Sequence, residues 1–291
     1  MKHIGLVLSG GMGKGAYQVG ALSAISEFFS PSDFEYVSAA SVGVLNTYAF
    51  LTNNLEQAKH IWENVNLQGS RRFITSVLKS NYLHDVIEGL VVDTQIENTF
   101  YVPLLELSTR ELEYYDFSKI APEDMQQYLS ASVAMPFYNK GVKIGTKALY
   151  DGAVVDNIPI YPVLKEKLDY VLCIYFDEVN YIFEDYDSDN KVLRLTFSDD
   201  KIVSNSVYIK HDSIVKMIDE GYRKTKEILS FVFSEGFEDL DFIHERIEEI
   251  NAANNNRTMR ITGDVIVTNI NKLAKKIVRH NKTAEGGKTN E

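Results

Sequence analysis

The sequence predicts an α/β protein with a mainly parallel central sheet and helical additions at its C-terminal end. Ile4–Leu8 is an apolar, branched run typical of a buried strand, and from Ala16 the apolar residues recur at helical spacing. Phe34–Ser38 has the composition of a second strand, and the apolar stretch Val42–Leu51 suits a helix. Strands that alternate with helices favour a parallel sheet covered by helices. From about Ser213 helical spacing continues in successive runs.

The turn after the first strand, Gly10–Gly15 (GGMGKG), is rich in glycine. Glycine allows positive backbone angles and close approach of a bound group, and the helix start offers unpaired N–H groups and a positive dipole end. We therefore expect this turn to hold an anion. A nucleotide phosphate fits poorly, because Lys14 is followed by Gly15 where Ser or Thr is needed, and Met12 takes a glycine position of the dinucleotide fingerprint.

Ser41 lies between the second strand and its helix, flanked by the small residues Ala39 and Gly43. A serine at a sharp strand-to-helix turn is exposed at the carboxyl edge of a sheet, where it can act as a nucleophile. The alternative is that Ser41 only caps the helix, since serine is a preferred N-cap residue.

Asp151 follows the strand-like stretch Lys147–Tyr150 and precedes Gly152. A serine hydroxyl is a weak nucleophile at neutral pH, so it needs a base and fixed donors for the oxyanion that forms. Asp151 can supply the base. Asp-Gly is also a common hairpin turn signal, and Asp156 is a second carboxylate close by.

Four segments, taken in order, resemble the patatin-like phospholipase family of lipid acyl hydrolases. They are Gly10–Gly20 (GGMGKGAYQVG), similar to the oxyanion loop and its helix, Ala39–Asn46 (AASVGVLN), similar to the nucleophile elbow, Ala131–Pro136 (ASVAMP), and Asp151–Pro159 (DGAVVDNIP). The resemblance implies a three-layer α/β/α fold and a Ser-Asp dyad, with Ser41 as nucleophile and Asp151 as general base. It implies no metal and no cofactor.

The resemblance also assigns the residues around the dyad. The oxyanion hole is expected at Gly10, Gly11, Met12 and Gly13, and the supporting residues are Lys14, Gly15, Gly43, Gly152 and Asn157. Met12 and Ala39 stand where the family has glycine. Methionine also carries a backbone N–H, so the hole persists if Met12 adopts the required angles, at the cost of strain at positive φ.

The expected function is lipid acyl hydrolysis through an acyl-serine intermediate. Three alternatives stay open. The chain can be a catalytically weak lipid- or nucleotide-binding regulatory protein, an acyltransferase, or a hydrolase whose triad is completed by a histidine. The histidine candidates after Asp151 are His211, His244 and His280.

Composition limits the partners and the location. The net charge of −11 argues against nucleic acid, because phosphate binding needs concentrated positive charge. The single cysteine, Cys173, allows no internal disulfide and suits a reducing compartment. No apolar run of about eighteen residues, the length of a membrane span, occurs, and no signal peptide is evident. We expect a cytoplasmic protein, with peripheral membrane contact as an addition.

The 291 residues suggest a catalytic domain over 1–205 and a helical region over 206–291, with a disordered tail from about 283. Glu178–Asp189 is acidic and predicted to be a solvated loop. A last helix is expected to carry both apolar and basic residues; the apolar ones are Ile266, Ile270, Leu273 and Ile277, and the basic ones are Lys272, Lys275, Lys276 and Arg279. Such a helix can dock on anionic lipid or pack on the domain.

Overall fold

The computed structural model describes residues 2–64, 82–176, 180–183, 190–197, 211–253, 258–261 and 269–273. The strands of the main sheet are β1 (Ile4–Leu8), β2 (Phe34–Ala39), β3 (Thr99–Glu106), β4 (Glu111–Asp116), β5 (Val142–Ile144), β6 (Lys147–Asp151), β7 (Tyr170–Tyr175) and β9 (Val192–Thr196). A separate ribbon pairs β8 (Asn180–Phe183) with β10 (Thr258–Ile261). The helices are α1 (Gly15–Ile25), α2 (Val42–Leu51), α3 (Leu55–Glu63), α5 (Tyr82–Leu90), α6 (Pro122–Ser132), α7 (Tyr161–Leu164), α9 (His211–Val232) and α10 (Leu240–Ala253).

The centre of the main sheet is parallel, as predicted. The hydrogen-bonded path runs β5-β6-β3-β2-β1-β7-β9, and every pair from β3 to β9 is parallel. β4 and β6 are antiparallel to β3, and β5 is antiparallel to β6. Strand β1 is buried along its whole length, which explains its unbroken apolar sequence, since both faces of a central parallel strand are covered.

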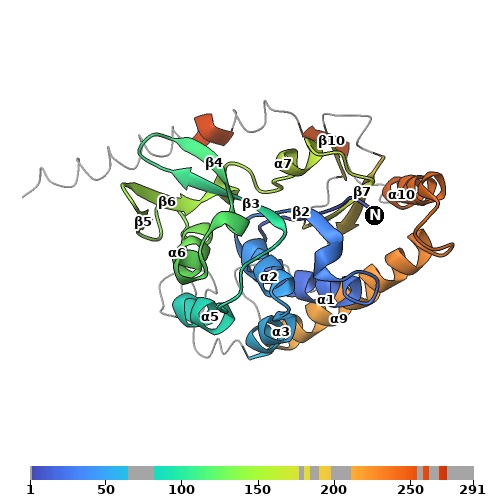
Figure 1. The fold of residues 1–291 in the computed structure, drawn as a ribbon, viewed down its shortest axis with the longest axis horizontal. Coiled ribbons are helices and arrows are strands. Elements are labelled where there is room, and N and C mark those ends of the chain that lie inside the picture. The colour runs from blue at the N-terminus through green and yellow to red at the C-terminus, as the bar shows by residue number, and fades with distance from the viewer. Residues whose placement is uncertain are drawn as a thin grey trace, which may run out of the picture.

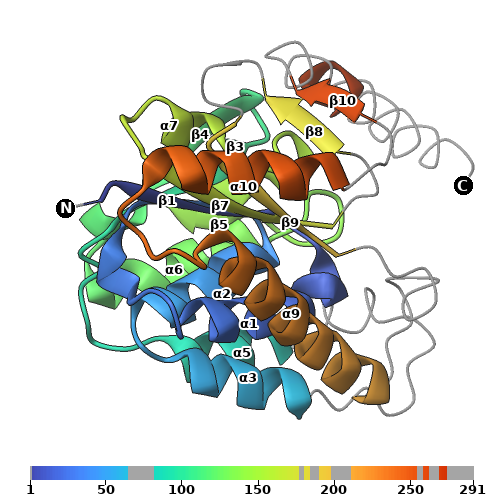
Figure 2. The same ribbon diagram turned by 90° about the vertical axis from the view of Figure 1, so that its right-hand side faces the viewer.

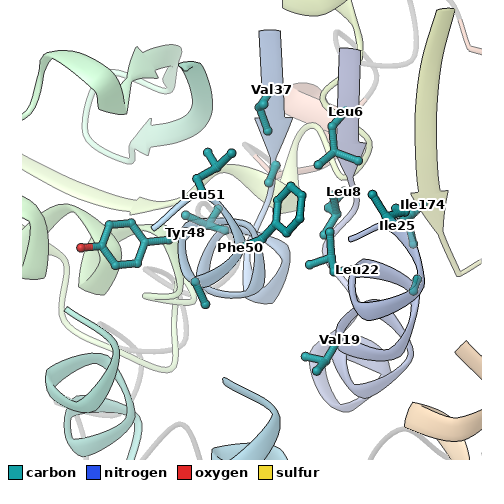
Figure 3. Packing of buried hydrophobic residues seen from close by; sticks show 14 of the residues in the cluster. Leu6, Leu8, Val19, Leu22, Ile25, Val37, Tyr48, Phe50, Leu51 and Ile174 are labelled. Carbon is teal, nitrogen blue, oxygen red and sulfur yellow. The ribbon is translucent and has the colours of Figure 1, made fainter. Parts of the chain in front are cut away.

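Most helices gather on one face of this sheet (Figure 1), whereas α7 and the β8–β10 ribbon lie on the other (Figure 2). Leu22 of α1 and Phe50 of α2 point toward the strands in Figure 3, where they meet Leu6 and Leu8 of β1. The opposite face has its own apolar cluster, which joins Val7 of β1 to α7. The α/β fold with a mainly parallel sheet between helices is therefore confirmed.

Helix α9 crosses directly over α1, and the two are in contact in Figure 2. Glycines make this approach possible. A Cβ atom on Gly20 would lie 1.9 Å from the carbonyl oxygen of Ile218, and one on Gly221 would lie 2.2 Å from that of Tyr17. Backbone atoms cannot retreat as a flexible side chain does, so each helix requires glycine where the other touches it.

Helix α10 covers the open edge of β9. The side chain of Asn251 donates to the Val192 carbonyl over 2.8 Å and accepts from the Arg194 N–H over 3.2 Å. An edge strand exposes unpaired backbone groups, and a buried amide side chain satisfies two of them here.

The acidic connector Glu178–Asp189 is not purely a loop, because β8 lies within it; the β-prone stretch Tyr181–Phe183 outweighs the flanking acidic residues and pairs with β10. The predicted boundary at residues 205 and 206 and the tail from 283 fall outside the described residues, so the division into two regions stays a prediction.

The glycine contact between α1 and α9 makes a stability prediction. We expect Gly20→Ala to lower the free energy of unfolding by about 2–3 kcal/mol or more, because the added methyl group must push two backbones apart. Chemical denaturation measures the change. Gly89→Ala in α5 is the matched control, since its Cβ meets nothing closer than 3.7 Å, and it should be neutral or stabilising by up to about 1 kcal/mol. Equal effects of the two substitutions would contradict the close contact.

Candidate active site

Ser41 occupies a strained turn between β2 and α2. Its backbone angles are φ 53° and ψ −130°, a region that residues with a side chain rarely adopt. The serine stands at the N-cap position of α2, yet its side chain makes no capping hydrogen bond. The Ser41 hydroxyl therefore does not cap helix α2.

Gly43 allows this turn to sit against β1. A Cβ atom there would lie 2.7 Å from the carbonyl oxygen of Ser9 and 3.1 Å from that of Leu8. The N–H of Ala40 donates to the Leu8 carbonyl over 3.0 Å, which ties the turn to the end of the same strand. The small residues around Ser41 are thus required by backbone contact.

Asp151 reaches the same edge from an antiparallel strand. β3 runs parallel to β2, continues past its end and pairs there with β6, so that Leu104 lies opposite Asp151. Gly152 follows directly, and a Cβ atom on it would lie 2.4 Å from the Pro103 carbonyl oxygen. Asp151 is thereby placed beyond the carboxyl end of β2, where Ser41 follows.

The Asp151 carboxyl group is fully buried and incompletely bonded. Its Oδ1 accepts the Ala153 N–H over 2.9 Å. Its Oδ2 is buried without a hydrogen bond of standard geometry to the described part of the chain. Burial raises the pKa of Asp151 to about 7, whereas hydrogen bonding from the Ser41 hydroxyl and the Ala153 N–H acts to lower it. Ser41 therefore lies beside the carboxyl group without completing a well-formed bond.

The glycine-rich turn is fastened to the segment after Asp151. The Gly10 N–H donates to the Asn157 carbonyl over 3.1 Å, and the Asn157 side chain donates to the Gly10 carbonyl over 3.4 Å. A Cβ atom on Gly10 would lie 2.5 Å from the Asn157 side-chain oxygen and 3.0 Å from Cβ of Ser41. Three segments distant in sequence thus meet at Gly10.

The three N–H groups that follow Gly10 in the turn differ from that of Gly10, which has a backbone partner. The N–H groups of Gly11, Met12 and Gly13 donate no backbone hydrogen bond to the part of the chain that is described. Met12 has φ 51°, so the predicted positive angle is present and a side chain occupies a conformation that favours glycine. Because its own N–H is occupied by Asn157, Gly10 positions the turn, and the three following amides are the ones available to an anion.

A buried polar network behind the turn was not anticipated from the sequence. The Gln18 side chain donates to the Ser9 carbonyl over 2.7 Å, and Asn46 donates to both the Gly15 carbonyl and Gln18, over 3.0 and 2.9 Å. The Trp62 indole donates to Asn46 over 3.0 Å. The network ties α2 and α3 to the start of α1. Buried amides in otherwise apolar helices were the signal that could have indicated it.

Asp156, the competing carboxylate, has a different partner. The Tyr114 hydroxyl on β4 donates to its Oδ2. Burial raises the pKa of Asp156 to about 6, and it raises the pKa of Tyr114 as well. Asp156 is therefore engaged with β4, while Asp151 is the carboxyl group beside Ser41.

The remaining candidates are Lys14 and the three histidines that follow Asp151 in the sequence. Lys14 makes no salt bridge within the described ranges, so no carboxylate partner for it is found there. His244 contacts the Asp169 carbonyl over 2.8 Å, just before β7 begins and thus at the opposite edge of the sheet. His211 begins α9 and is exposed, and His280 lies outside the described residues.

No group of three or more His, Cys, Asp or Glu side chains that could hold a metal ion occurs among the residues described. Within the same residues, no helix is both long and apolar enough to span a bilayer.

Comparisons with known proteins give the family. The profile described as patatin-like phospholipase matches residues 6–164, more than half of the chain, and this stretch contains all four motifs around Ser41 and Asp151. The chain belongs to the patatin-like phospholipase family. Membership places it broadly among the lipid acyl hydrolases.

A solved structure agrees with this fold. The patatin-like chain is similar to VipD from Legionella pneumophila, with a TM-score of 0.50 and 13% sequence identity over 88% of this chain and 74% of that one. At this identity the likeness concerns the fold alone. A search of curated proteins finds no match.

The buried carboxyl group of this patatin-like protein makes stability depend on pH. A folded pKa of about 7, above the ordinary value of about 3.9, means that the contribution of Asp151 to stability is complete below about pH 4 and is lost as pH rises from there to about 7. Asp151→Asn removes this loss. The difference in free energy of unfolding, variant minus wild type, should therefore be about 2–3 kcal/mol more positive at pH 8 than at pH 5.

Chemical denaturation of both proteins at the two pH values tests this expectation. The raised pKa of Asp156 is common to both proteins and cancels in the difference. An advantage that does not change with pH would show that Asp151 is not a buried titrating group.

Proposed function

We propose that the protein is a serine-dependent lipid acyl hydrolase with Ser41 as nucleophile and Asp151 as general base. The observation that carries the proposal is the strained Ser41, whose hydroxyl caps no helix and lies beside a buried carboxyl group. Strain of this kind persists where surrounding structure imposes it, and it is frequent at active sites. Loose hydrogen bonds in a free enzyme commonly tighten once substrate binds.

The mechanism follows from the placement of these groups. The Asp151 carboxylate takes the proton of Ser41, whose oxygen attacks the ester carbonyl carbon, and the negative charge develops on the carbonyl oxygen. The N–H groups of Gly11, Met12 and Gly13 stabilise this oxyanion. The alkoxide leaves with a proton from Asp151, and an acyl-serine remains. Water, deprotonated by Asp151, then attacks the acyl-serine. The bond between the acyl group and the Ser41 oxygen breaks, Ser41 takes its proton back from Asp151, and the fatty acid is released.

The raised pKa suits this role for Asp151. A base with a pKa near the working pH is partly unprotonated in the free enzyme and is strong enough to accept a proton from serine. The supporting residues act on geometry: Asn157 holds Gly10, while Gly43 and Gly152 allow the backbones to approach. Lys14 and Gly15 continue the turn into α1.

Lipid is the proposed substrate because of the family, and contact with a membrane surface is proposed with it. The basic C-terminal segment stays a prediction, since Lys275, Lys276 and Arg279 lie outside the described residues. Leu273, on the apolar face of this segment, is buried against Leu105 and Val155, so residues 269–273 are packed on the domain. That packing favours a domain-bound helix over one that inserts into lipid. A cytoplasmic location is proposed on the sequence features alone.

Activity and covalent labelling test the assignment together. Ser41→Ala and Asp151→Asn should each lower turnover of a short-chain ester and of phospholipid by at least about a thousandfold, since each removes a member of a unit. A fluorophosphonate probe should label the wild type at Ser41. Asp156→Asn is the matched control, because it removes a buried carboxylate five residues away and keeps an acceptor for Tyr114. Wild-type rates in folded Ser41→Ala protein would refute the assignment.

Substitution of Met12 tests whether the protein is an active enzyme or a catalytically weak binding protein. Both Met12→Gly and Met12→Ala remove the side chain, but only glycine is at ease at φ 51°. We expect the glycine variant to exceed the alanine variant by about 1 kcal/mol in free energy of unfolding. Turnover in both should stay within about tenfold of wild type, as the backbone donor is retained. If the wild type neither hydrolyses esters nor reacts with the fluorophosphonate probe, and Met12→Gly restores both reactions, the wild-type site is degraded.

A further inference from the structure

The segment between α6 and β5 presents two neighbouring aromatic side chains to solvent. Phe137 is 39% exposed and Tyr138 is 57% exposed. The other large hydrophobic side chains that are exposed in the described ranges, Val215 and Phe231, lie apart on α9, and the Arg246 guanidinium covers the Phe231 ring at 4.6 Å. Adjacent exposed aromatic residues are uncommon on a soluble surface and indicate contact with another phase or molecule.

The backbone is strained to present them. Phe137 has φ 70°, an outlier for a bulky residue. A tight turn imposes it: the Met135 carbonyl accepts the N–H groups of Tyr138 and Asn139 over 3.2 and 3.0 Å, and the Asn139 side chain accepts the Met135 N–H over 3.1 Å. The outward position is thus fixed by hydrogen bonds.

This turn begins at the proposed general base. The Asp151 N–H donates to the Ala134 carbonyl over 2.9 Å. Tyr138 follows Ala134 by four residues, so its backbone lies within about 14 Å of that bond even if the chain were extended. In Figure 1, α6 and β5 lie together with β6 at the same end of the sheet. A surface that touches Phe137 and Tyr138 is therefore brought near the site.

The charge of the surrounding sequence selects the kind of surface. Between Asp124 and Asp151 the chain has no acidic residue and three lysines, in a protein whose net charge is −11. Lys147 pairs with Glu113 over 2.6 Å, whereas the exposed Lys140 and Lys143 form no salt bridge within the described part of the chain. Aromatic rings beside lysines suit the interface of an anionic bilayer, where rings enter the headgroup region and ammonium groups meet phosphates.

We propose that the Phe137–Tyr138 turn, with Lys140 and Lys143, is an interfacial loop that seats the protein on an anionic phospholipid surface with Asp151 and Ser41 close to the lipid. The rest of the acidic molecule is repelled from such a surface, which orients it with this loop toward the bilayer. The inference rests on the proposed function for its biological meaning, but the binding itself requires no catalysis.

Binding is tested in a Ser41→Ala background, so that turnover plays no part. The protein is sedimented with vesicles of phosphatidylcholine and phosphatidylglycerol, and with vesicles of phosphatidylcholine alone. Adding Phe137→Ser and Tyr138→Ser should lower partition to the anionic vesicles at least tenfold. Adding Lys143→Glu should lower it at least fivefold, since one lysine contributes about fivefold near an anionic surface. Binding of the parent should be weaker on phosphatidylcholine alone.

Two matched controls lie on α9. Phe231→Ser changes a ring that is 38% exposed, close to the 39% of Phe137, and Lys216→Glu reverses an exposed lysine. Both should bind like the parent, and the basic C-terminal segment is present in every variant. Unchanged partition of the aromatic variant, or equal loss in the controls, would overturn the proposal. So would a parent that binds no vesicles, or an aromatic variant that changes only self-association in size-exclusion chromatography.

A second readout links the loop to catalysis. With Ser41 present, the aromatic variant should hydrolyse a soluble short-chain ester at the wild-type rate and lose vesicle hydrolysis by the same factor as binding. Absence of ester hydrolysis in the wild type would refute the proposed function, while the sedimentation result would still decide the loop. Parallel loss of both hydrolytic activities would overturn the interfacial role.

Discussion

The site depends on backbones that approach one another too closely for side chains. Gly10 leaves room for Ser41 and Asn157, Gly43 for the end of β1, and Gly152 for Pro103. None of these contacts is an attraction of great strength. They matter because a packed interior cannot open locally to admit an extra methyl group without moving a strand or a helix. The relative positions of Ser41, Asp151 and the amides of the glycine-rich turn are thus fixed by steric exclusion, and the hydrogen bonds between Gly10 and Asn157 hold the turn in place.

This constraint explains the strain at two residues of the site that carry side chains. Met12 and Ser41 both have positive φ, and each lies at the first turn after a parallel strand. The cost of each conformation is small beside the apolar burial of the adjoining β1, α1 and α2. The buried carboxyl group of Asp151 adds a further cost near neutral pH. Such unfavourable features are tolerated where a rigid scaffold surrounds them.

Much of the fold could be predicted because local sequence and tertiary environment agree. The ranges of β1 and α2 match the sequence pattern residue for residue, since an apolar strand and an apolar helix are bounded by glycine and serine signals. The amides of Gln18 and Asn46 in apolar helices indicate that buried partners exist, but the partners themselves, Trp62 among them, could not be predicted, because hydrogen bonds between helices leave no periodic trace. The ribbon of β8 and β10 was missed for a related reason: its two strands are short and far apart in sequence.

The site was predictable to the extent that its motifs are contiguous. Ser41 and Asp151 were predicted as a pair from the turns that hold them, and the two residues lie together at the end of the sheet, while their catalytic roles stay a proposal. The role of Gly10 was not predictable in detail, as the use of its N–H by Asn157 depends on a contact across the fold. The charge pattern around Phe137 was visible in the sequence, but exposure of the ring required coordinates.

The close packing of α1 on α9, at Gly20 and at Gly221, has a consequence for the order in which parts of the chain become ordered. Helix α1 carries the glycine-rich turn at its start, yet α9, which supports it, is synthesised only after Ser41 and Asp151. An emerging polypeptide therefore contains both side chains before that support is present. Until α9 has been made, the face of α1 that it covers is open, and the amide cluster gains its full rigidity only once α9 packs there.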